Sequence, residues 1–214
     1  TLTLPTSNGS NGQSIITNGS GALSFQWNAG TLFYRLNADL VGSNSASPAQ
    51  KIFGVGVTLA ASTVYSFTGL YVFSKTLGAT GHDFRVGWSL STASVNNIIL
   101  VGQSVAANAA ISTDDTTTVA FVHNGTGNTK VVSVSSAIFT IALQVTGTVS
   151  VNGGGIATPT YDLTAAPGGA YSTVAGSYIA FTPIGAAGSN SSQGTWSYCL
   201  LYTSPSPRDA TLSR

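Results

Sequence analysis

The amino-acid sequence predicts an all-β protein: an antiparallel, jelly-roll-like β-sandwich preceded by a short β-ribbon connector. Helix formers are scarce, because the 214-residue chain contains no Glu and no Met. Thr and Val, which favour strands, and the turn formers Gly, Asn and Ser are abundant, with 25 Gly. Short apolar runs recur between Gly, Asn and Ser clusters, which is typical of a sandwich.

The chain carries little charge. Charged residues make up 6% of it, against roughly 25% in a typical soluble domain. Hydrophobic residues make up 43%, which indicates an ordered protein, since disordered segments combine low hydrophobicity with high net charge. A formal net charge of +1 gives no field for attracting DNA, RNA or an anionic membrane. The low net charge therefore predicts no nucleic-acid partner. No run of about 18 apolar residues occurs, so we expect no membrane insertion either.

Residues 1–30 are expected to form the ribbon connector. Three short alternating segments, 2–4, 13–17 and 23–27, are joined by Asn-Gly and Gly-rich turns. Two or three short strands are marginal in water, so we expect the ribbon to pack against other chains or against sequence that precedes it. The chain has no initiating Met and opens in mid-strand alternation with TLTL, which predicts a piece of a longer protein.

Residues 31–198 are expected to form one sandwich head domain. Turn clusters separate nine predicted strands, at 31–40, 51–59, 64–74, 83–90, 98–105, 117–123, 130–135, 138–151 and 177–183. Alternation in the third of these places Tyr65, Phe67, Tyr71 and Phe73 on one face, which we expect to enter the core. The segments NGGGIATP and APGGA are expected to be loops.

The end of the chain, residues 199–214, differs abruptly in composition from what precedes it. Its first part, CLLYTSPSPRD, contains the only Cys. This string resembles the translation of a transposase sequencing adapter, so we expect 199–214 to be an artefact that is disordered and outside the fold. Without it the chain has five basic and five acidic side chains and no Cys, which excludes disulfides and thiolate metal sites.

The ribbon resembles a module of bacteriophage tail-fibre and related virion proteins. The shared pattern is LTLP, a Gly-containing turn, GQ, a short apolar strand, NGSG and a closing aromatic, here Trp27. Ser14-Ile15-Ile16 stands where the module more often has Val-Leu. The stretch LAASTVYSFTGLYVFSKTLG, with the later SVNGGG, AAPGGAYSTVAGSYIAFTPIG and GTW, is similar to head domains of marine phage structural proteins over most of 31–197. The resemblance implies a virion structural protein.

The sequence offers few residues for catalysis. The only imidazoles are His82 and His123, and outside the tail every carboxyl side chain comes from five Asp residues. Asp114 and Asp115 are adjacent, so turn chemistry is their simplest interpretation and a calcium site is the alternative. His82 and Asp83 are adjacent too, but no nucleophile motif such as GxSxG accompanies them. We expect no enzymatic activity, no cofactor and no metal site.

Residues suited to recognition are more plentiful. Hydroxyl and amide side chains can hydrogen-bond sugars, and aromatic rings near strand ends or loops can stack on them. The candidate stacking residues are Trp88, Tyr171 and Trp196, with His82 and Arg85 as polar partners. Packing in the core is the alternative for each aromatic ring.

The residues and the resemblance together predict a non-enzymatic virion protein of a phage tail fibre or tail tip, extracellular after release. We expect a homotrimer that contacts other virion tail proteins, because a chain with so little charge is best kept soluble by burying apolar surface between subunits. A host-surface glycan or receptor is the expected external partner. The alternative is a carbohydrate-binding or carbohydrate-active domain of a bacterial surface adhesin or secreted enzyme.

Overall fold

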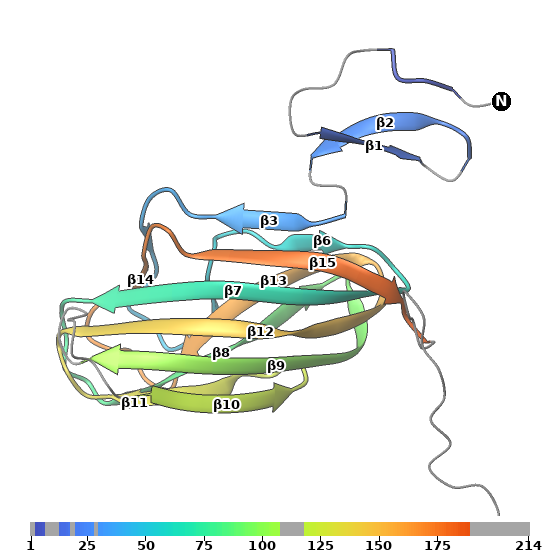
Figure 1. The fold of residues 1–214 in the computed structure, drawn as a ribbon. Helices are drawn as coiled ribbons and strands as arrows, with labels where there is room; N and C mark the ends of the chain where they lie inside the picture. The colour runs from blue at the N-terminus through green and yellow to red at the C-terminus, as the bar shows by residue number, and fades with distance from the viewer. Residues whose placement is uncertain (1–2, 7–12, 18–19, 28–29, 108–117, 189–214) are drawn as a thin grey trace, which may run out of the picture.

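The computed structural model describes residues 3–6, 13–17, 20–27, 30–107 and 118–188. Within these ranges every regular element is a β-strand, and all pairs of named strands are antiparallel. Two sheets pack as a sandwich, and a small two-stranded sheet precedes them (Figure 1). The predicted class, an all-β antiparallel sandwich with a short ribbon before it, is confirmed.

The larger sheet contains eight strands. From one edge the order is β10 (Thr118–Asn124), β9 (Ser94–Ala107), β12 (Phe139–Gly153), β7 (Thr63–Lys75), β14 (Ser172–Thr173) and β4 (Leu40–Val41). The side of β7 that pairs with β14 also pairs with β15 (Tyr178–Ala186). On its other side β15 pairs with β3 (Leu32–Arg35). The strand β3 is therefore an edge of this sheet.

The smaller sheet contains five strands. Its order is β11 (Thr129–Val134), β8 (His82–Ser91), β13 (Gly155–Leu163) and β5 (Gln50–Lys51), with β6 (Val57–Leu59) also paired to β13. From β6 to β9, and again from β10 to β13, each connection carries the chain from one sheet to the other. This repeated crossing gives the sandwich its jelly-roll-like character.

The ribbon consists of β1 (Gln13–Thr17) and β2 (Leu23–Trp27), which are two of the three predicted ribbon segments. The register places Ile15 opposite Phe25. Thr3 from the third segment adds a bridge to Ala22 and exchanges backbone hydrogen bonds with Gly21 and Leu23 at 2.8 and 3.0 Å. Among the described strands, β1 and β2 pair only with each other.

Aromatic side chains from both sheets fill the core. The predicted aromatic face of β7 is confirmed, because Tyr65, Phe67, Tyr71 and Phe73 are all buried. Phe67 contacts Trp88 of the opposite sheet with ring centroids 5.4 Å apart. Further along, Phe73 lies 4.9 Å from Phe84. These cross-sheet contacts hold the two layers in register.

Two predictions for individual strands are corrected by the structure. The segments 31–40 and 51–59 each divide into two short strands, β3 with β4 and β5 with β6. The segment Gly155–Leu163, part of which was expected to be a loop, is β13, an inner strand of the smaller sheet. The loop was predicted from the cluster of Gly, Asn and Pro residues in NGGGIATP. Proline within a strand normally argues for an edge position, because it donates no ladder hydrogen bond.

The position of Pro159 explains why the strand tolerates it. Its carbonyl accepts a hydrogen bond from the backbone N–H of Ile52 at 3.0 Å, so its nitrogen points to the same side of β13. On that side the pairing with β6 ends at Ala157 and the pairing with β5 begins at Thr160. The missing N–H therefore falls in a gap between two partner strands.

Candidate functional site

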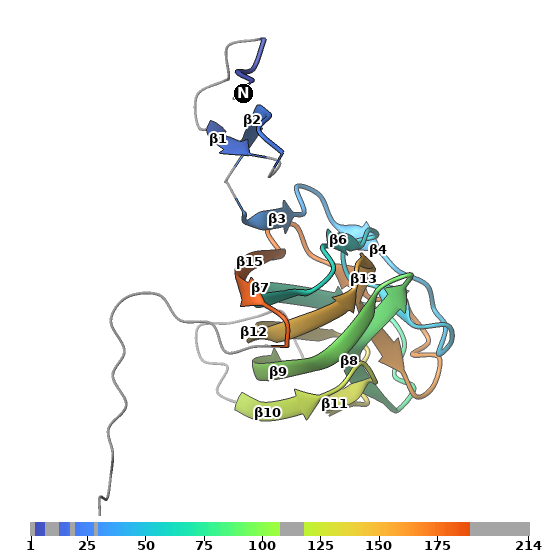
Figure 2. The ribbon, with the colours of Figure 1, turned by 90° about the vertical axis from the view of Figure 1, so that its right-hand side faces the viewer.

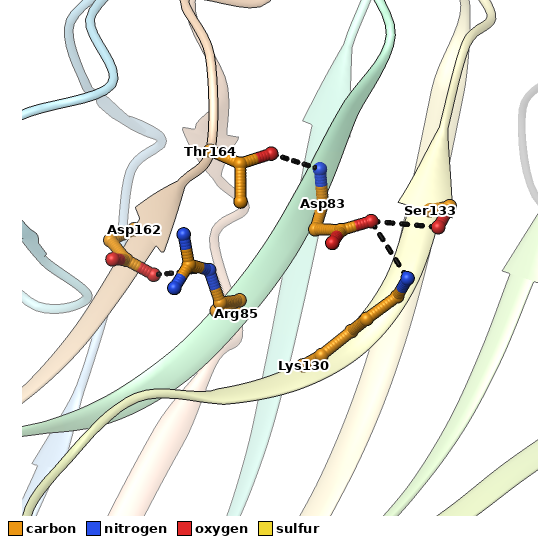
Figure 3. Close-up of polar contacts among 6 residues, drawn as sticks. All are labelled: Asp83, Arg85, Lys130, Ser133, Asp162 and Thr164. Atoms are coloured by element: carbon orange, nitrogen blue, oxygen red, sulfur yellow. Dashed lines mark hydrogen bonds and ion pairs between the residues drawn. The ribbon is translucent and has the colours of Figure 1, made fainter.

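Charge is concentrated on the outer face of the smaller sheet. The described residues include eight charged side chains, which are Arg35, Asp39, Lys51, Lys75, Asp83, Arg85, Lys130 and Asp162. Four of them lie on neighbouring strands: Asp83 and Arg85 on β8, Lys130 on β11 and Asp162 on β13 (Figure 3). Buried Phe84 separates Asp83 from Arg85, so these two point away from the core. We name these four residues the charged cluster.

Asp83 is the most highly bonded member of the charged cluster. Its Oδ1 lies 2.8 Å from Lys130 Nζ and accepts a hydrogen bond from Ser133 Oγ at 2.7 Å. Its backbone N–H donates to Thr164 Oγ1 at 2.7 Å. The hydrogen bonds from Lys130 and Ser133 hold the pKa of Asp83 below its ordinary value. Asp83 therefore stays ionised and neutralises Lys130.

Arg85 and Asp162 form a looser pair. Arg85 Nε lies 3.5 Å from Asp162 Oδ1, and the two side chains are 33% and 17% exposed. Both atoms are buried, and neither has a hydrogen-bond partner among the described residues. The register places Arg85 opposite Lys130 on one side and Asp162 on the other, so Asp162 offsets the repulsion between two facing cations.

A polar hollow of about 360 Å³ adjoins the charged cluster at Asp83. It is lined by Gly81, His82, Asp83, Ser133, Val134, Ser135 and Thr164. The carboxylate of Asp83 and the hydroxyl groups of three of these side chains supply its polar atoms. Because Asp83, Ser133 and Val134 lie on the paired strands β8 and β11, much of the hollow has a rigid wall.

An apolar groove of about 430 Å³ lies between the edge strand β3 and the segment that leads into β6. Phe33 and Tyr34 line it and are 56% and 42% exposed, whereas Phe53 and Phe181, which also line it, are buried. Figure 2 shows β3 and β6 at the end of the sandwich nearest the ribbon, and β10 and β11 at the opposite end. None of the groove-lining residues is charged.

The structure brings two of the predicted ligand residues together, but in the core. His82 and Tyr171 are both buried, and His82 Nε2 lies 2.8 Å from the Tyr171 hydroxyl oxygen. Burial raises the pKa of the Tyr171 phenol, which therefore keeps its proton. Trp88 is also buried, with Phe67 and Phe181 against its ring. Trp88 and Tyr171 therefore pack in the core, which was the alternative interpretation for each aromatic ring. A sugar in solvent cannot stack on either ring.

Arg85 is the predicted site residue that faces outward, and Trp196 lies outside the described residues. The two residues adjacent to Arg85 in the sheet, Lys130 and Asp162, were not among the predicted ligand residues, and neither was Asp83. One sequence signal could have found Asp83: in HDFRVGW, charged residues alternate with apolar ones, so Asp83 and Arg85 must share a face. Nothing local predicts that Lys130 and Asp162 join them.

The described ranges contain no group of three or more His, Cys, Asp or Glu side chains that could hold a metal ion. Asp114 and Asp115, for which a calcium site was the alternative interpretation, lie outside these ranges. In the same ranges there is no helix long and apolar enough to span a bilayer.

The comparisons with known proteins identify no family. No family model and no curated protein matches the chain. One solved structure, "Structure of infectious bursal disease virus Gx strain", is similar at 16% identity and a TM-score of 0.17, covering 78% of this chain and 42% of that chain. This chain therefore spans less than half the length of the viral chain it matches, and a TM-score this low does not establish a shared fold.

Proposed function

We propose that this protein is a non-enzymatic structural component of a phage virion, part of a tail fibre or tail tip, that assembles as a homotrimer and contributes to host attachment. The observation that carries the proposal is the ribbon. Its LTLP, GQ, NGSG and closing-aromatic pattern resembles a phage fibre module, and its segments 13–17 and 23–27 form the paired strands β1 and β2.

The ribbon also supports assembly on physical grounds. Its two strands have no further partner strand among the described residues, and Leu4 and Ile15 are 68% and 56% exposed. An isolated two-stranded sheet is marginally stable in water. Ribbons from three chains that pack around a common axis would bury these apolar side chains against one another.

The apolar groove lies where such an assembly would bring the sandwiches together. Only residues 28–30 separate Trp27, the last residue of β2, from Thr31, the first residue of the groove. A connection of four Cα steps spans at most about 14 Å. If three ribbons share an axis, each groove lies close to that axis, and the exposed rings of Phe33 and Tyr34 would be covered by neighbouring subunits.

A passive role agrees with the side chains available. Asp83 is bound to Lys130, and His82 is turned into the core with both ring nitrogens within hydrogen-bond distance of oxygen atoms. Neither residue is placed as a free acid or base next to a nucleophile. The competing proposal, a carbohydrate-active or adhesin domain of a bacterium, needs a catalytic or surface-sorting unit elsewhere in its protein.

Two experiments separate these proposals. The genes next to the coding sequence should encode tail-assembly or baseplate proteins, whereas a catalytic domain or sorting signal in the same reading frame would favour the bacterial alternative. The chain should also be incubated with purified bacterial lipopolysaccharide and capsule while released reducing sugar is measured. We expect no release, and sustained turnover of either polysaccharide would overturn the non-enzymatic proposal.

A further inference from the structure

We infer that the open edge of β3, with the apolar groove beside it, receives strand β1 from the ribbon of a neighbouring copy of this chain, added antiparallel to β3. The inference rests on the proposed function and deepens it, because it names the contact through which the subunits would hold one another.

The edge of β3 that faces away from β15 is open. The backbone N–H of Leu36 donates to the carbonyl of Ser177 at 2.9 Å, and its own carbonyl accepts from Gly176 at 2.8 Å, so Leu36 faces the segment that leads into β15. Because bonding alternates along an antiparallel strand, the backbone groups of Phe33 and Arg35 point to the opposite side. No described strand pairs with β3 on that side. Such an edge is a template for a strand from another chain.

The apolar groove lies beside this edge, between the two layers of the sandwich. Tyr34 of β3 lines it, and its ring lies 5.8 Å from that of Phe53, which is buried. Val55, across the groove from β3, is 43% exposed. A strand added to β3 would continue the larger sheet, and every second side chain of that strand would point toward the groove. The added strand would therefore cover apolar surface as well as pair with the open edge.

Strand β1 has the properties that this position requires. It has five residues against four in β3, and no described strand pairs with it on the side away from β2. The outer edge of β2 is already occupied at its start, where the N–H of Leu23 donates to the Thr3 carbonyl at 3.0 Å. Residues 13–27 carry no charge, like the residues that line the groove, and Ile15 is 56% exposed. An uncharged strand enters an uncharged groove without burying an unpaired charge.

The short connection between β2 and β3 requires that β1 come from another copy. Strand β1 is antiparallel to β2, as are all pairs of named strands in the described ranges. If β1 added antiparallel to β3 of its own chain, β2 and β3 would be parallel strands of one sheet. Parallel strands need a connection of about a dozen residues or more, whereas only residues 28–31 connect β2 to β3. A second chain has no such constraint.

Cross-linking between two variants of the full chain tests the inference. Both variants carry Cys199→Ser, one adds Ile15→Cys and the other adds Val55→Cys, so a link between positions 15 and 55 can only join different chains. The variants are mixed at low concentration, concentrated and treated with a short bismaleimide, and mass spectrometry identifies the joined peptides. We expect a link between positions 15 and 55. In the control, Val122→Cys replaces Val55→Cys and should give no link to position 15, because Val122 is 71% exposed on β10 at the opposite end of the sandwich.

Phe33→Pro tests the backbone pairing separately. Proline removes the N–H that points to the open side of β3 and leaves the hydrogen bonds to β15 in place, whereas Phe33→Ala removes the ring and keeps this N–H. Sedimentation should give a trimer dissociation constant about tenfold higher for Phe33→Pro than for Phe33→Ala. Melting temperatures show whether both are folded, and the cross-link decides the question if Phe33→Pro is not.

The outcomes separate this inference from the proposed function. A trimer without the link between positions 15 and 55, or equal dissociation constants for folded Phe33→Pro and Phe33→Ala, overturns strand addition at β3 and leaves the trimer standing. A chain that stays monomeric overturns both.

Discussion

The Nε2 atom of His82 lies 2.8 Å from the hydroxyl oxygen of Tyr171 in the interior of the sandwich. The other ring nitrogen, Nδ1, lies 2.7 Å from the carbonyl oxygen of Thr80, which can only accept, so Nδ1 carries a proton. In the neutral ring Nε2 is then left to accept the O–H of Tyr171. The loop residue Tyr171 is thus fastened to the start of β8 by a buried hydrogen bond.

Replacing Tyr171 with Phe should destabilise the fold. The change leaves His82 Nε2 buried without its partner, which costs about 1–3 kcal/mol. Tyr34→Phe is the control, because Tyr34 is 42% exposed. Chemical denaturation of both variants measures the free energy of unfolding. Equal stabilities for the two variants would show that the His82–Tyr171 contact does not stabilise the core.

Truncating the aromatic core should have a larger effect. Phe67 is 2% exposed and its ring lies 5.4 Å from Trp88 and 5.7 Å from Phe181. Phe67→Ala should therefore lower the free energy of unfolding by about 3–5 kcal/mol. Phe33→Ala, at a ring that is 56% exposed, should change it by less than about 0.5 kcal/mol in the monomer. A silent Phe67→Ala would mean that β7 has a different register.

Features of the fold that depend on local periodicity were predictable from the sequence. Alternation along β7 correctly placed four aromatic side chains in the core, and the short alternating segments predicted at 13–17 and 23–27 are the strands β1 and β2. The same rule applied to β8 would have turned Trp88 inward, since it shares the parity of Phe84, which is buried. The burial of Trp88, which was a candidate for stacking on a sugar, was therefore predictable from the sequence.

Other features could not be predicted because they depend on distant parts of the chain. Tyr171 lies outside any strand, so no alternation determines its burial. Pro159 is acceptable in β13 only because β5 and β6 leave a gap beside it. The charged cluster forms from three strands whose residues are far apart in sequence, and only their pairing places Lys130 and Asp162 on either side of Arg85.

Acid should remove the contribution of the Asp83–Lys130 pair. Lys130 and Ser133 lower the pKa of Asp83 in the folded state. The pair therefore stabilises the fold at pH values above about 3.9, the pKa of an Asp side chain in an unfolded chain. This stabilisation is lost as the pH falls through the lower pKa that Asp83 has in the folded state. We expect the unmodified chain to melt at a higher temperature than Asp83→Asn at about pH 7, and the difference to shrink below about pH 4. Melting curves across this range check it, and a difference that persists unchanged in acid would contradict the assignment.

A charge in the apolar groove should weaken assembly. Val55 lines the groove and is 43% exposed. Val55→Asp would place a carboxylate where neighbouring subunits are proposed to meet, so we expect the apparent dissociation constant of the trimer to rise about tenfold or more. Val122→Asp is the control, because Val122 is 71% exposed on β10, at the end of the sandwich opposite the groove. Concentration-dependent light scattering compares the two. Equal dissociation constants for both variants would exclude the groove from the interface.

Sedimentation velocity of the full chain at micromolar concentration tests most directly whether the protein is an assembled virion component. If ribbons and grooves associate as proposed, the main species should have three times the 21.6 kDa mass of one chain. It should dissociate on dilution without loss of β-structure in circular dichroism, because the sandwich has its own core. A single stable species of 21.6 kDa at these concentrations would contradict the proposed function.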